Sequence, residues 1–332
     1  MKVIVLGAGI NGTTCALKIK EKYPDYDVTL LGAQFSPNTT GDGSGGLWYP
    51  YLCGKTPEAL IRKWGMETYG LLLNLWRQGG YGISLQPVFV MYRDGTHSAP
   101  EWTNHVFGYV ELDQKQLEYF NKLFSVQYVA GNTFNTFVVN PSTLLKRLEQ
   151  QLDELKVTRK QGSVKSLTDP MLRDYDVIIN CTGLGAREVV PDEKVHPIRG
   201  QILKVDAPWV FYSIQDKCSG HYIIPNDTFC VLGGTGQANN YSTEVNSDDT
   251  DFIERGCHSL IPSLKTANIQ KYFVGLRPAR DEVRAEAERI NGKLYIHNYG
   301  HGGSGFTLFW GCGSTVLELF EKNVAINNTS KL

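Results

Sequence analysis

The sequence predicts a mixed α/β fold in which three segments, far apart along the chain, meet in one parallel sheet. The first is a βαβ pattern at the N-terminus, with apolar strands at 3–6 and 27–31 and a helix at 13–20 between them. The second is the apolar strand 175–181, which ends in a glycine-rich turn. The third is a glycine-dense loop at 300–305 that leads into a helix. Segments separated in this way predict two interleaved domains.

The remaining elements follow from apolar periodicity and from the residues that begin helices and turns. Helical spacing is found at 57–79, 141–155, 250–260 and 307–322. Strand patterns are found at 83–92, 201–205, 229–233 and 294–297, and a short strand is expected around Val164.

The composition excludes several classes of protein. Hydrophobic residues make up 42% of the 332 residues and charged residues 20%, which is typical of a globular chain. A net charge of −1 without basic runs argues against nucleic acid and anionic membranes as partners. No apolar segment approaches the roughly 20 residues of a membrane span, and no signal peptide is expected. The seven cysteines show no CxxC spacing, so we expect reduced thiols and no metal site.

The first motif with chemical content is Gly7-Ala8-Gly9-Ile10-Asn11-Gly12, which joins a strand to a helix. Its glycines permit a tight turn, the approach of a pyrophosphate and close packing of helix on strand, while the helix N-terminus attracts phosphate. The motif therefore predicts a dinucleotide site. Such a unit usually carries an acidic residue about 20 positions further on for the ribose. Here Gly32, Ala33 and Gln34 occupy that place, and Gln34 can bind a ribose less strongly than a carboxylate.

The second motif is IHNYGHGGSGFT at 296–307. A loop this rich in glycine lets a planar ring lie against the backbone. A helix beginning at Thr307 would stabilise the negative charge of a reduced flavin. His297 and His301 are interpreted as packed, hydrogen-bonded side chains, because the reaction considered below needs no imidazole.

Further motifs follow one another in a recognisable order. They are GAGING at 7–12, FSPNTTGDGSGGLWYPYL at 35–52, YDVIINCTGLGA at 175–186, IRGQILKVDAPW at 198–209, YIIP at 222–225, GLRPARDEVR at 275–284, and YIHNYGHGGSGFT followed by WGCG. In this order they resemble the FAD-dependent D-amino-acid oxidase family. The resemblance implies a Rossmann-type FAD-binding domain interleaved with a mainly antiparallel substrate domain. The expected ranges are 1–50, 141–196 and 272–325 for the first, 51–140 and 197–271 for the second, and 326–332 for a flexible tail.

The resemblance also implies roles for individual residues. Arg277 in GLRPAR pairs with the substrate α-carboxylate, which its planar fork can bind in two places, and the Tyr222 hydroxyl binds the same carboxylate. The Gly303 carbonyl accepts the substrate amine. The alternative for Arg277 is a structural ion pair with an acid such as Asp281. The residues expected to bind FAD are Gly7, Ala8, Gly9, Ile10, Asn11, Gly12, Thr39, Thr40, Gly45, Gly46, Leu47, Val164, Thr182, Gly183, Gly302, Gly303, Ser304, Gly305, Phe306 and Thr307.

The implied reaction transfers a hydride from the α-carbon of a D-amino acid to the flavin. Dioxygen then reoxidises the flavin to give hydrogen peroxide, and the imine hydrolyses to ammonia and a 2-oxo acid. The sequence departs from its relatives at 43–47, where GSGGL replaces VAAGL, and at Tyr49, where mammalian enzymes have glutamine. With the missing ribose acid, these departures leave a flavin-binding protein of little activity as an alternative.

The side chain of the substrate is less clearly specified. D-Aspartate oxidases place arginines where this chain has Gln215 and Gly236, and a buried carboxylate needs such a partner. Lys217 can supply a charge, and the short loop before Tyr222 is typical of D-aspartate oxidases. Two missing arginines favour neutral or broad D-amino acids, with D-aspartate and D-glutamate as the alternative.

Two other classes of flavin or nucleotide enzyme share part of this pattern. A nicotinamide-dependent dehydrogenase would share GAGING but would have no use for the C-terminal glycine loop or GLRP. A glycine- or sarcosine-type amine oxidase shares the flavin architecture and is separated by its substrates.

The sequence ends in Ser330-Lys331-Leu332, the peroxisomal address SKL. It predicts import into the peroxisome by the receptor that reads this tripeptide. A homodimer is a further expectation.

Overall fold

The computed structural model describes residues 1–95, 99–123 and 126–329, so that the SKL tripeptide lies outside the described residues. One sheet extends through the molecule in the order β4-β5-β3-β9-β10-β11-β8-β13-β14-β7-β1-β2-β6, and the short strand β12 pairs with β8. The pairing changes at β14, which is antiparallel to β13 and parallel to β7.

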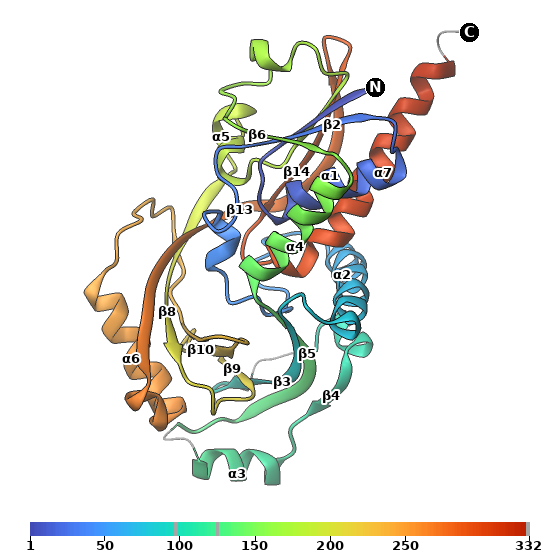
Figure 1. Cartoon of the computed structure of the whole chain (residues 1–332). Helices are drawn as coiled ribbons and strands as arrows, with labels where there is room; N and C mark the ends of the chain where they lie inside the picture. Colours follow the sequence, from blue (N-terminus) through green and yellow to red (C-terminus); the bar gives the residue numbers. More distant parts are fainter. Residues whose placement is uncertain (96–98, 124–125, 330–332) are drawn as a thin grey trace.

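The parallel half of the sheet is built from the three separated segments, as the sequence predicts. β1 pairs in parallel with β2 and β7, β7 with β14, and β2 with β6. Helices α1, α4 and α7 pack together beside these strands (Figure 1). The bounds are β1 (Lys2–Leu6), α1 (Ile10–Lys22), β2 (Asp27–Gly32), α4 (Pro141–Glu154), β6 (Thr158–Gln161), β7 (Val177–Asn180), β14 (Lys293–His301) and α7 (Gly305–Thr329).

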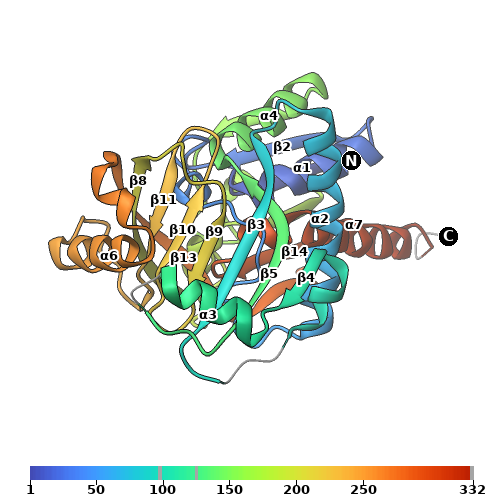
Figure 2. The ribbon, with the colours of Figure 1, turned by 90° about the horizontal axis from the view of Figure 1, so that it is seen from below.

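The other half of the sheet is mainly antiparallel, with β3 and β9 as a parallel pair. Figure 2 shows its strands side by side from below, with α3 near them. The bounds are α2 (Glu58–Gln78), β3 (Ile83–Tyr92), β4 (Phe107–Glu111), α3 (Gln114–Leu123), β5 (Ala130–Val139), β8 (His196–Asp206), β9 (Ser213–Asp216), β10 (Tyr222–Pro225), β11 (Cys230–Gly233), β12 (Gln237–Ala238) and α6 (Ser247–Leu260). Short helical turns are η1 (Thr40–Gly43), η2 (Glu101–His105), η3 (Pro170–Leu172), η4 (Gly183–Gly185), α5 (Ala186–Val189) and η5 (Pro262–Thr266).

Strand β13 (Asn268–Ile290) belongs to both halves. Its first part, up to Ala279, pairs with β8, and its second part, from Arg284, pairs with β14. The register shifts between these two residues, which marks a bulge where the sheet passes from one half to the other. The boundary expected between 271 and 272 therefore falls inside a continuous strand, and the division into two domains stays a prediction.

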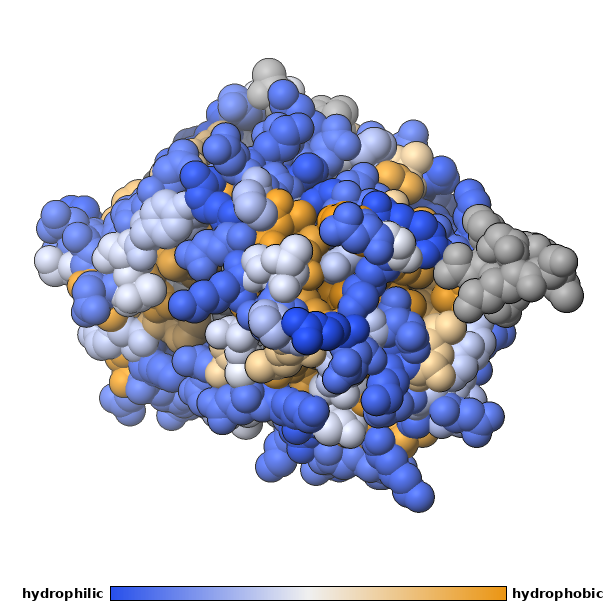
Figure 3. Space-filling view, turned by 90° about the horizontal axis from the view of Figure 1, so that it is seen from above, coloured by the Kyte–Doolittle hydropathy of each residue, from blue (hydrophilic) through white to orange (hydrophobic). Residues whose placement is uncertain are grey.

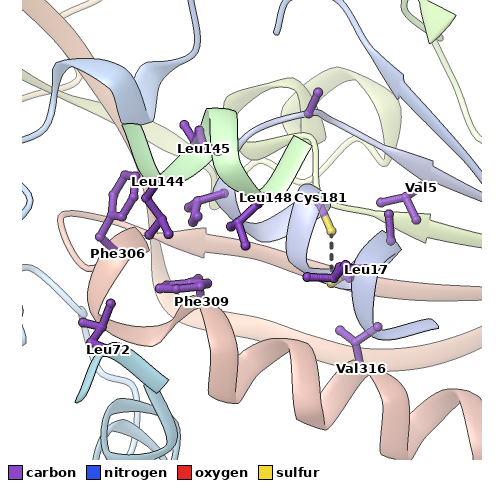
Figure 4. Packing of buried hydrophobic residues seen from close by; sticks show 14 of the residues in the cluster. Val5, Leu17, Leu72, Leu144, Leu145, Leu148, Cys181, Phe306, Phe309 and Val316 are labelled. Atoms are coloured by element: carbon purple, nitrogen blue, oxygen red, sulfur yellow. Dashed lines mark hydrogen bonds between the residues drawn. The ribbon is translucent and has the colours of Figure 1, made fainter. Parts of the chain in front are cut away.

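The core beside the parallel strands shows why α4 forms where it does. Asn140 accepts a hydrogen bond from the Thr143 backbone N–H at 3.3 Å, which caps the helix in front of Pro141. Leu144 and Leu148 are four residues apart, so they share the face of α4 that enters the core (Figure 4). This packing anchors α4 against α1, the helix that follows the GAGING turn.

Two local expectations are wrong. Val164 lies in a loop after β6 rather than in a strand, and it packs with Ile178 in a buried cluster. The true edge strand, Thr158–Gln161, consists of exposed polar residues, so its sequence lacks the apolar alternation that predicts a strand. The glycine-dense loop is also shorter than expected, because Gly300 and His301 still belong to β14 and α7 begins at Gly305.

Within the part of the chain that the structure describes, no helix combines the length and the apolar character needed to cross a bilayer. Figure 3 shows a mostly hydrophilic face, on which apolar residues gather near the centre.

Candidate active site

A cavity of about 500 Å3 lies where the two halves of the molecule meet, and both halves contribute to its lining. Residues from the GAGING turn, the η1 segment, the β7 turn and the C-terminal glycine loop form one part, and residues from β8, β10 and β13 form the other. The predicted site residues found in the lining are Gly7, Ala8, Gly9, Ile10, Asn11, Thr39, Thr40, Gly45, Gly46, Leu47, Thr182, Gly183, Tyr222, Arg277, Gly302, Gly303, Gly305 and Phe306.

The GAGING turn has the geometry of a phosphate site. Gly7 has a φ of 97°, a value that favours glycine, and its N–H donates to the Leu31 carbonyl at 2.7 Å. Gly9 precedes α1 and has no side chain to cap the helix, so the first N–H groups of α1 stay available for an anion. Gly12 lies outside the lining and packs against the backbone of the turn, where a Cβ would overlap the Gly7 carbonyl oxygen. It serves the close packing of helix and turn.

The position after β2, where a ribose-binding acid is usual, carries no acidic residue, as the sequence shows. Ala33 and Gln34 after β2 belong to the cavity lining, and so do Thr39 and Thr40. Asp42 is buried nearby and accepts hydrogen bonds from the Thr39 N–H and hydroxyl at 2.9 and 2.7 Å. Its carboxylate is occupied in shaping the η1 turn.

Ser304 of the C-terminal loop and Thr307 of α7 lie behind the cavity lining rather than in it. The Ser304 hydroxyl accepts from the Tyr51 N–H at 2.7 Å and donates to the Tyr51 carbonyl at 2.8 Å. The Thr307 hydroxyl makes the same two bonds with Tyr49, at 3.2 and 3.0 Å. Ser304 and Thr307 thus hold the segment that carries two lining tyrosines. Val164 is likewise outside the lining and lies in the core.

The two histidines of the loop differ in their surroundings. His297 is buried and hydrogen-bonded to Asn180 and Glu288, as expected of a packed histidine. His301 belongs to the cavity lining, and burial lowers its pKa to about 4, so the imidazole is neutral. Its Nδ1 lies 3.4 Å from the Asn11 side-chain nitrogen.

Arg277 and Tyr222, the residues predicted to bind the substrate, come together in the cavity lining. Arg277 donates from Nη1 to the Thr235 carbonyl at 2.9 Å, and its Nη2 lies 3.5 Å from the Tyr222 hydroxyl. Among the residues that the structure describes, Arg277 forms no ion pair, so the pairing considered for Asp281 is absent. Burial raises the pKa of Tyr222, although Arg277 opposes the shift, and the phenol keeps its proton.

Glycines make room for these two side chains. Gly200 on β8 is the register partner of Gly275 on β13, two residues before Arg277. A Cβ on Gly200 would overlap the Arg277 guanidinium, and a Cβ on Gly233 would overlap the Tyr222 ring. The position of each functional side chain therefore depends on a glycine of a neighbouring strand.

The specificity positions lie around two tyrosines. Tyr49, Tyr51 and Gln215 belong to the lining. The Lys217 ammonium lies 5.4 Å from the centroid of the Tyr49 ring and 5.9 Å from that of Tyr51. Lys217 is an exposed residue. Its ammonium group nevertheless lies near two lining rings, which places it at the rim of the cavity. Partial desolvation of its ammonium group lowers its pKa. Gly236 approaches Tyr51 without belonging to the lining.

Several lining residues were not predicted as site residues. Three of them lie within the quoted motifs, namely Tyr51, Gly200 and Gly275. For Gly275, the nearby Arg277 was a usable signal. Apolar residues such as Phe273 and Ile202 gave no signal, because strand patterns do not show which buried face meets a ligand. The lining residues outside the predicted set include Asn38, Gly41, Gly43, Ser44, Tyr49, Tyr51, Cys181, Leu184, Gly200, Ile202, Gln215, Ile224, Phe273, Gly275, Pro278 and His301.

The cavity fits a large polar cofactor. Three buried polar atoms of lining residues, Asn11 Oδ1, Ser44 Oγ and His301 Nε2, have no hydrogen-bond partner within the described protein. Such atoms are rarely left unsatisfied in native proteins, so they indicate a ligand. Together with the uncapped start of α1 and the start of α7 at Gly305, they are typical of a dinucleotide-binding flavoprotein. The same cavity is lined by Arg277, which has no acidic partner among the described residues.

This class of protein is confirmed by comparison. Residues 2–319 match the model of the family described as FAD dependent oxidoreductase, and the chain belongs to this family, with FAD as its cofactor. A D-amino acid oxidase of Dugesia ryukyuensis is 37% identical, over 96% of this chain and 97% of that protein. A D-aspartate oxidase of Homo sapiens is 31% identical, over 97% and 95%. A glycine oxidase structure from Geobacillus kaustophilus has the same fold, with a TM-score of 0.80, 14% identity, and coverage of 96% and 94%.

Proposed function

We propose that the protein catalyses the oxidative deamination of D-amino acids: a D-amino acid, dioxygen and water give a 2-oxo acid, ammonia and hydrogen peroxide. The observation that carries this proposal is the unpaired guanidinium of Arg277 at the cavity, 3.5 Å from a protonated tyrosine. A cation without an acidic partner at a cofactor cavity is suited to a substrate carboxylate. The similarity to D-amino acid oxidases supports the same reaction.

The residues of the chain bind and orient the substrate. The Arg277 guanidinium offers a planar fork for the α-carboxylate. The Tyr222 oxygen faces the guanidinium, which leaves its O–H free to donate to the same carboxylate. The Gly303 carbonyl is the acceptor proposed for the substrate amine. Bound FAD supplies the hydride acceptor and passes the electrons to dioxygen. Fixing the carboxylate and the amine leaves the α-carbon hydrogen in one orientation, which selects one enantiomer.

Anaerobic bleaching of the FAD-loaded protein tests the reaction directly. D-Alanine and D-aspartate are mixed with the protein without oxygen, and the flavin absorbance is followed, with L-enantiomers as controls. We expect a D-enantiomer to bleach the flavin and its L-enantiomer to leave it oxidised. A flavin that binds but is bleached by no D-amino acid would instead identify a flavin-binding protein of little activity.

A second candidate function, oxidation of acidic D-amino acids, is favoured by Lys217. The expectation of neutral substrates rests on the absence of arginine at Gln215 and Gly236, and it stays a prediction. The Lys217 ammonium at the rings of Tyr49 and Tyr51 provides a cation at the rim of the same cavity. A side-chain carboxylate reaching this rim would find a partner there.

Replacing Lys217 decides between the two substrate classes. For Lys217→Met we compare kcat/KM for D-aspartate and D-alanine with wild type, and Lys265→Met serves as a surface control. If Lys217 binds the second carboxylate, the variant loses D-aspartate activity and keeps D-alanine activity. Equal effects on both substrates would leave neutral D-amino acids as the preferred class.

We further propose that the enzyme acts in the peroxisome. The proposal rests on the Ser330-Lys331-Leu332 address and on the chemistry, because a compartment that handles hydrogen peroxide suits an oxidase. The test is the location of a tagged protein with and without the tripeptide, with the tag at the N-terminus. The homodimer stays a prediction that light scattering can check.

A further inference from the structure

A chain of hydrogen bonds leads from the cofactor cavity to the protein surface. Thr182, in the cavity lining, donates from its N–H and its hydroxyl to Asn180 Oδ1, at 3.2 and 2.7 Å. The Asn180 side-chain nitrogen lies 3.2 Å from His297 Nδ1. His297 Nε2 lies 2.7 Å from a carboxylate oxygen of Glu288, whose side chain is 36% exposed. Four residues thus connect the cavity with solvent.

The donors and acceptors in this series of hydrogen bonds can be assigned in only one way. Thr182 offers two donors to one atom of Asn180, so that atom must be the amide oxygen. The amide nitrogen of Asn180 then faces His297 and donates to Nδ1. His297 therefore carries its proton on Nε2 and donates it to Glu288. The imidazole is neutral in this arrangement, because its Nδ1 lone pair is occupied as an acceptor.

The strands hold the chain of hydrogen bonds in place. His297 on β14 and Asn180 on β7 are register partners in the parallel sheet, and both are completely buried. Charged groups near the imidazole come from β13, namely Glu286, Glu288 and Arg284. On its other side the Tyr299 ring packs edge-on against it, and the Tyr299 hydroxyl donates to Asp192. Burial lowers the pKa of His297, and Arg284 adds to the shift while the two glutamates oppose it.

We propose that Asn180 and His297 are positioning residues that fix Thr182 for FAD, and that they do so only while His297 is neutral. The proposal rests on the predicted contact between Thr182 and the cofactor. It does not depend on which amino acid the enzyme oxidises. With its hydroxyl proton given to Asn180, Thr182 presents only acceptor lone pairs to the cavity. The segment around Thr182 also supports the GAGING turn, because a Cβ on Gly7 would overlap the Cys181 carbonyl.

Protonation of His297 would break this arrangement. A second N–H, on Nδ1, would face the amide N–H of Asn180, so two donors would oppose each other. Rotating the Asn180 amide would relieve that conflict but would turn its nitrogen toward the two donors of Thr182. The rotation would release Thr182, and without it the repulsion would displace the Asn180 side chain that holds Thr182. Since the folded protein disfavours protonated His297, FAD affinity should be full at neutral pH and fall as the pH drops below the ordinary range of histidine.

The test measures the dissociation of FAD from the purified holoenzyme, by flavin fluorescence on dilution, from about pH 8 to about pH 5. For wild type we expect an affinity that falls at the acid end. Asn180→Ala and His297→Leu remove the support of Thr182, and each should raise the Kd for FAD roughly tenfold at neutral pH. His297→Asn places a carbonyl acceptor near Nδ1 without a titrating group. It should bind FAD as wild type does at neutral pH and lose the acid dependence.

Controls separate this role from a general loss of stability. Ser213→Ala removes a buried hydroxyl outside the cavity lining and should leave FAD affinity unchanged at every pH. Thermal unfolding of each variant shows whether it is folded where its affinity is measured. The proposal is overturned if His297→Leu binds FAD as tightly as wild type, or if His297→Asn keeps the acid dependence. Bleaching by D-amino acids is not part of this readout, so failure of the proposed reaction would leave the result interpretable.

Discussion

At the scale of single residues, the proposed recognition of the substrate carboxylate predicts that the shape of Arg277 matters as well as its charge. Its Nη1 donates to the Thr235 carbonyl and its Nη2 to the Tyr222 hydroxyl, and the residue belongs to the cavity lining. Arg277→Gln should lower the second-order rate constant for flavin bleaching by D-alanine roughly 100-fold, because a charge-assisted pair with the carboxylate is lost. Arg277→Lys should recover part of this loss, since the charge remains and the fork does not. Stopped-flow bleaching measures both, and equal rates in all three proteins would place the carboxylate elsewhere.

Gln34 is the second residue whose chemistry can be tested alone. It lies in the lining after β2, where related nucleotide sites carry a carboxylate for the ribose. Gln34→Glu should tighten FAD binding by roughly fivefold, because a carboxylate accepts a stronger hydrogen bond from a hydroxyl than an amide does. Titration of the flavin-depleted protein with FAD gives the Kd, and Gln34→Ala serves as the reference for an absent acceptor. A weaker Kd for Gln34→Glu would show that this position does not meet the ribose.

At the scale of elements, sequence patterns predicted the glycine-rich turns of the site better than the residues of the strands that line it. The β1–α1 and β14–α7 turns were found because glycines at fixed spacing report directly on backbone shape. β6 was missed because an exposed edge strand of polar residues has no apolar alternation. Val164 was placed in a strand because it is apolar, but it packs into its buried cluster from a loop. Lining residues such as Phe273 depend on how β13 faces the η1 segment, and that is a property of tertiary packing rather than of local sequence.

The pairing of β8 with β13 leads to a prediction for Gly200. These strands bring Gly200 so close to Arg277 that any side chain at 200 would displace the guanidinium. Gly200→Ala should therefore raise KM for D-amino acids by roughly tenfold or more, with a smaller effect on FAD affinity. Steady-state kinetics and flavin titration measure the two effects. Gly70→Ala is a matched control, because Gly70 lies on α2 outside the lining and a Cβ there meets no atom within 4 Å. Unchanged KM in Gly200→Ala would mean that Arg277 adapts without loss.

At the scale of the whole molecule, β13 and the cavity join the two halves into one unit. The cavity takes residues from both halves, and β13 runs through both without a break. A ligand that binds only the folded state stabilises it by about 2.7 kcal/mol at a free concentration one hundred times its Kd. For a chain of this size we expect FAD to raise Tm by about 4 °C at that concentration. Because the halves share a strand, calorimetry should show one transition that moves as a whole. Two transitions, of which FAD moves only one, would show instead that the parallel half unfolds independently and that the bulge between Ala279 and Arg284 separates two cooperative units.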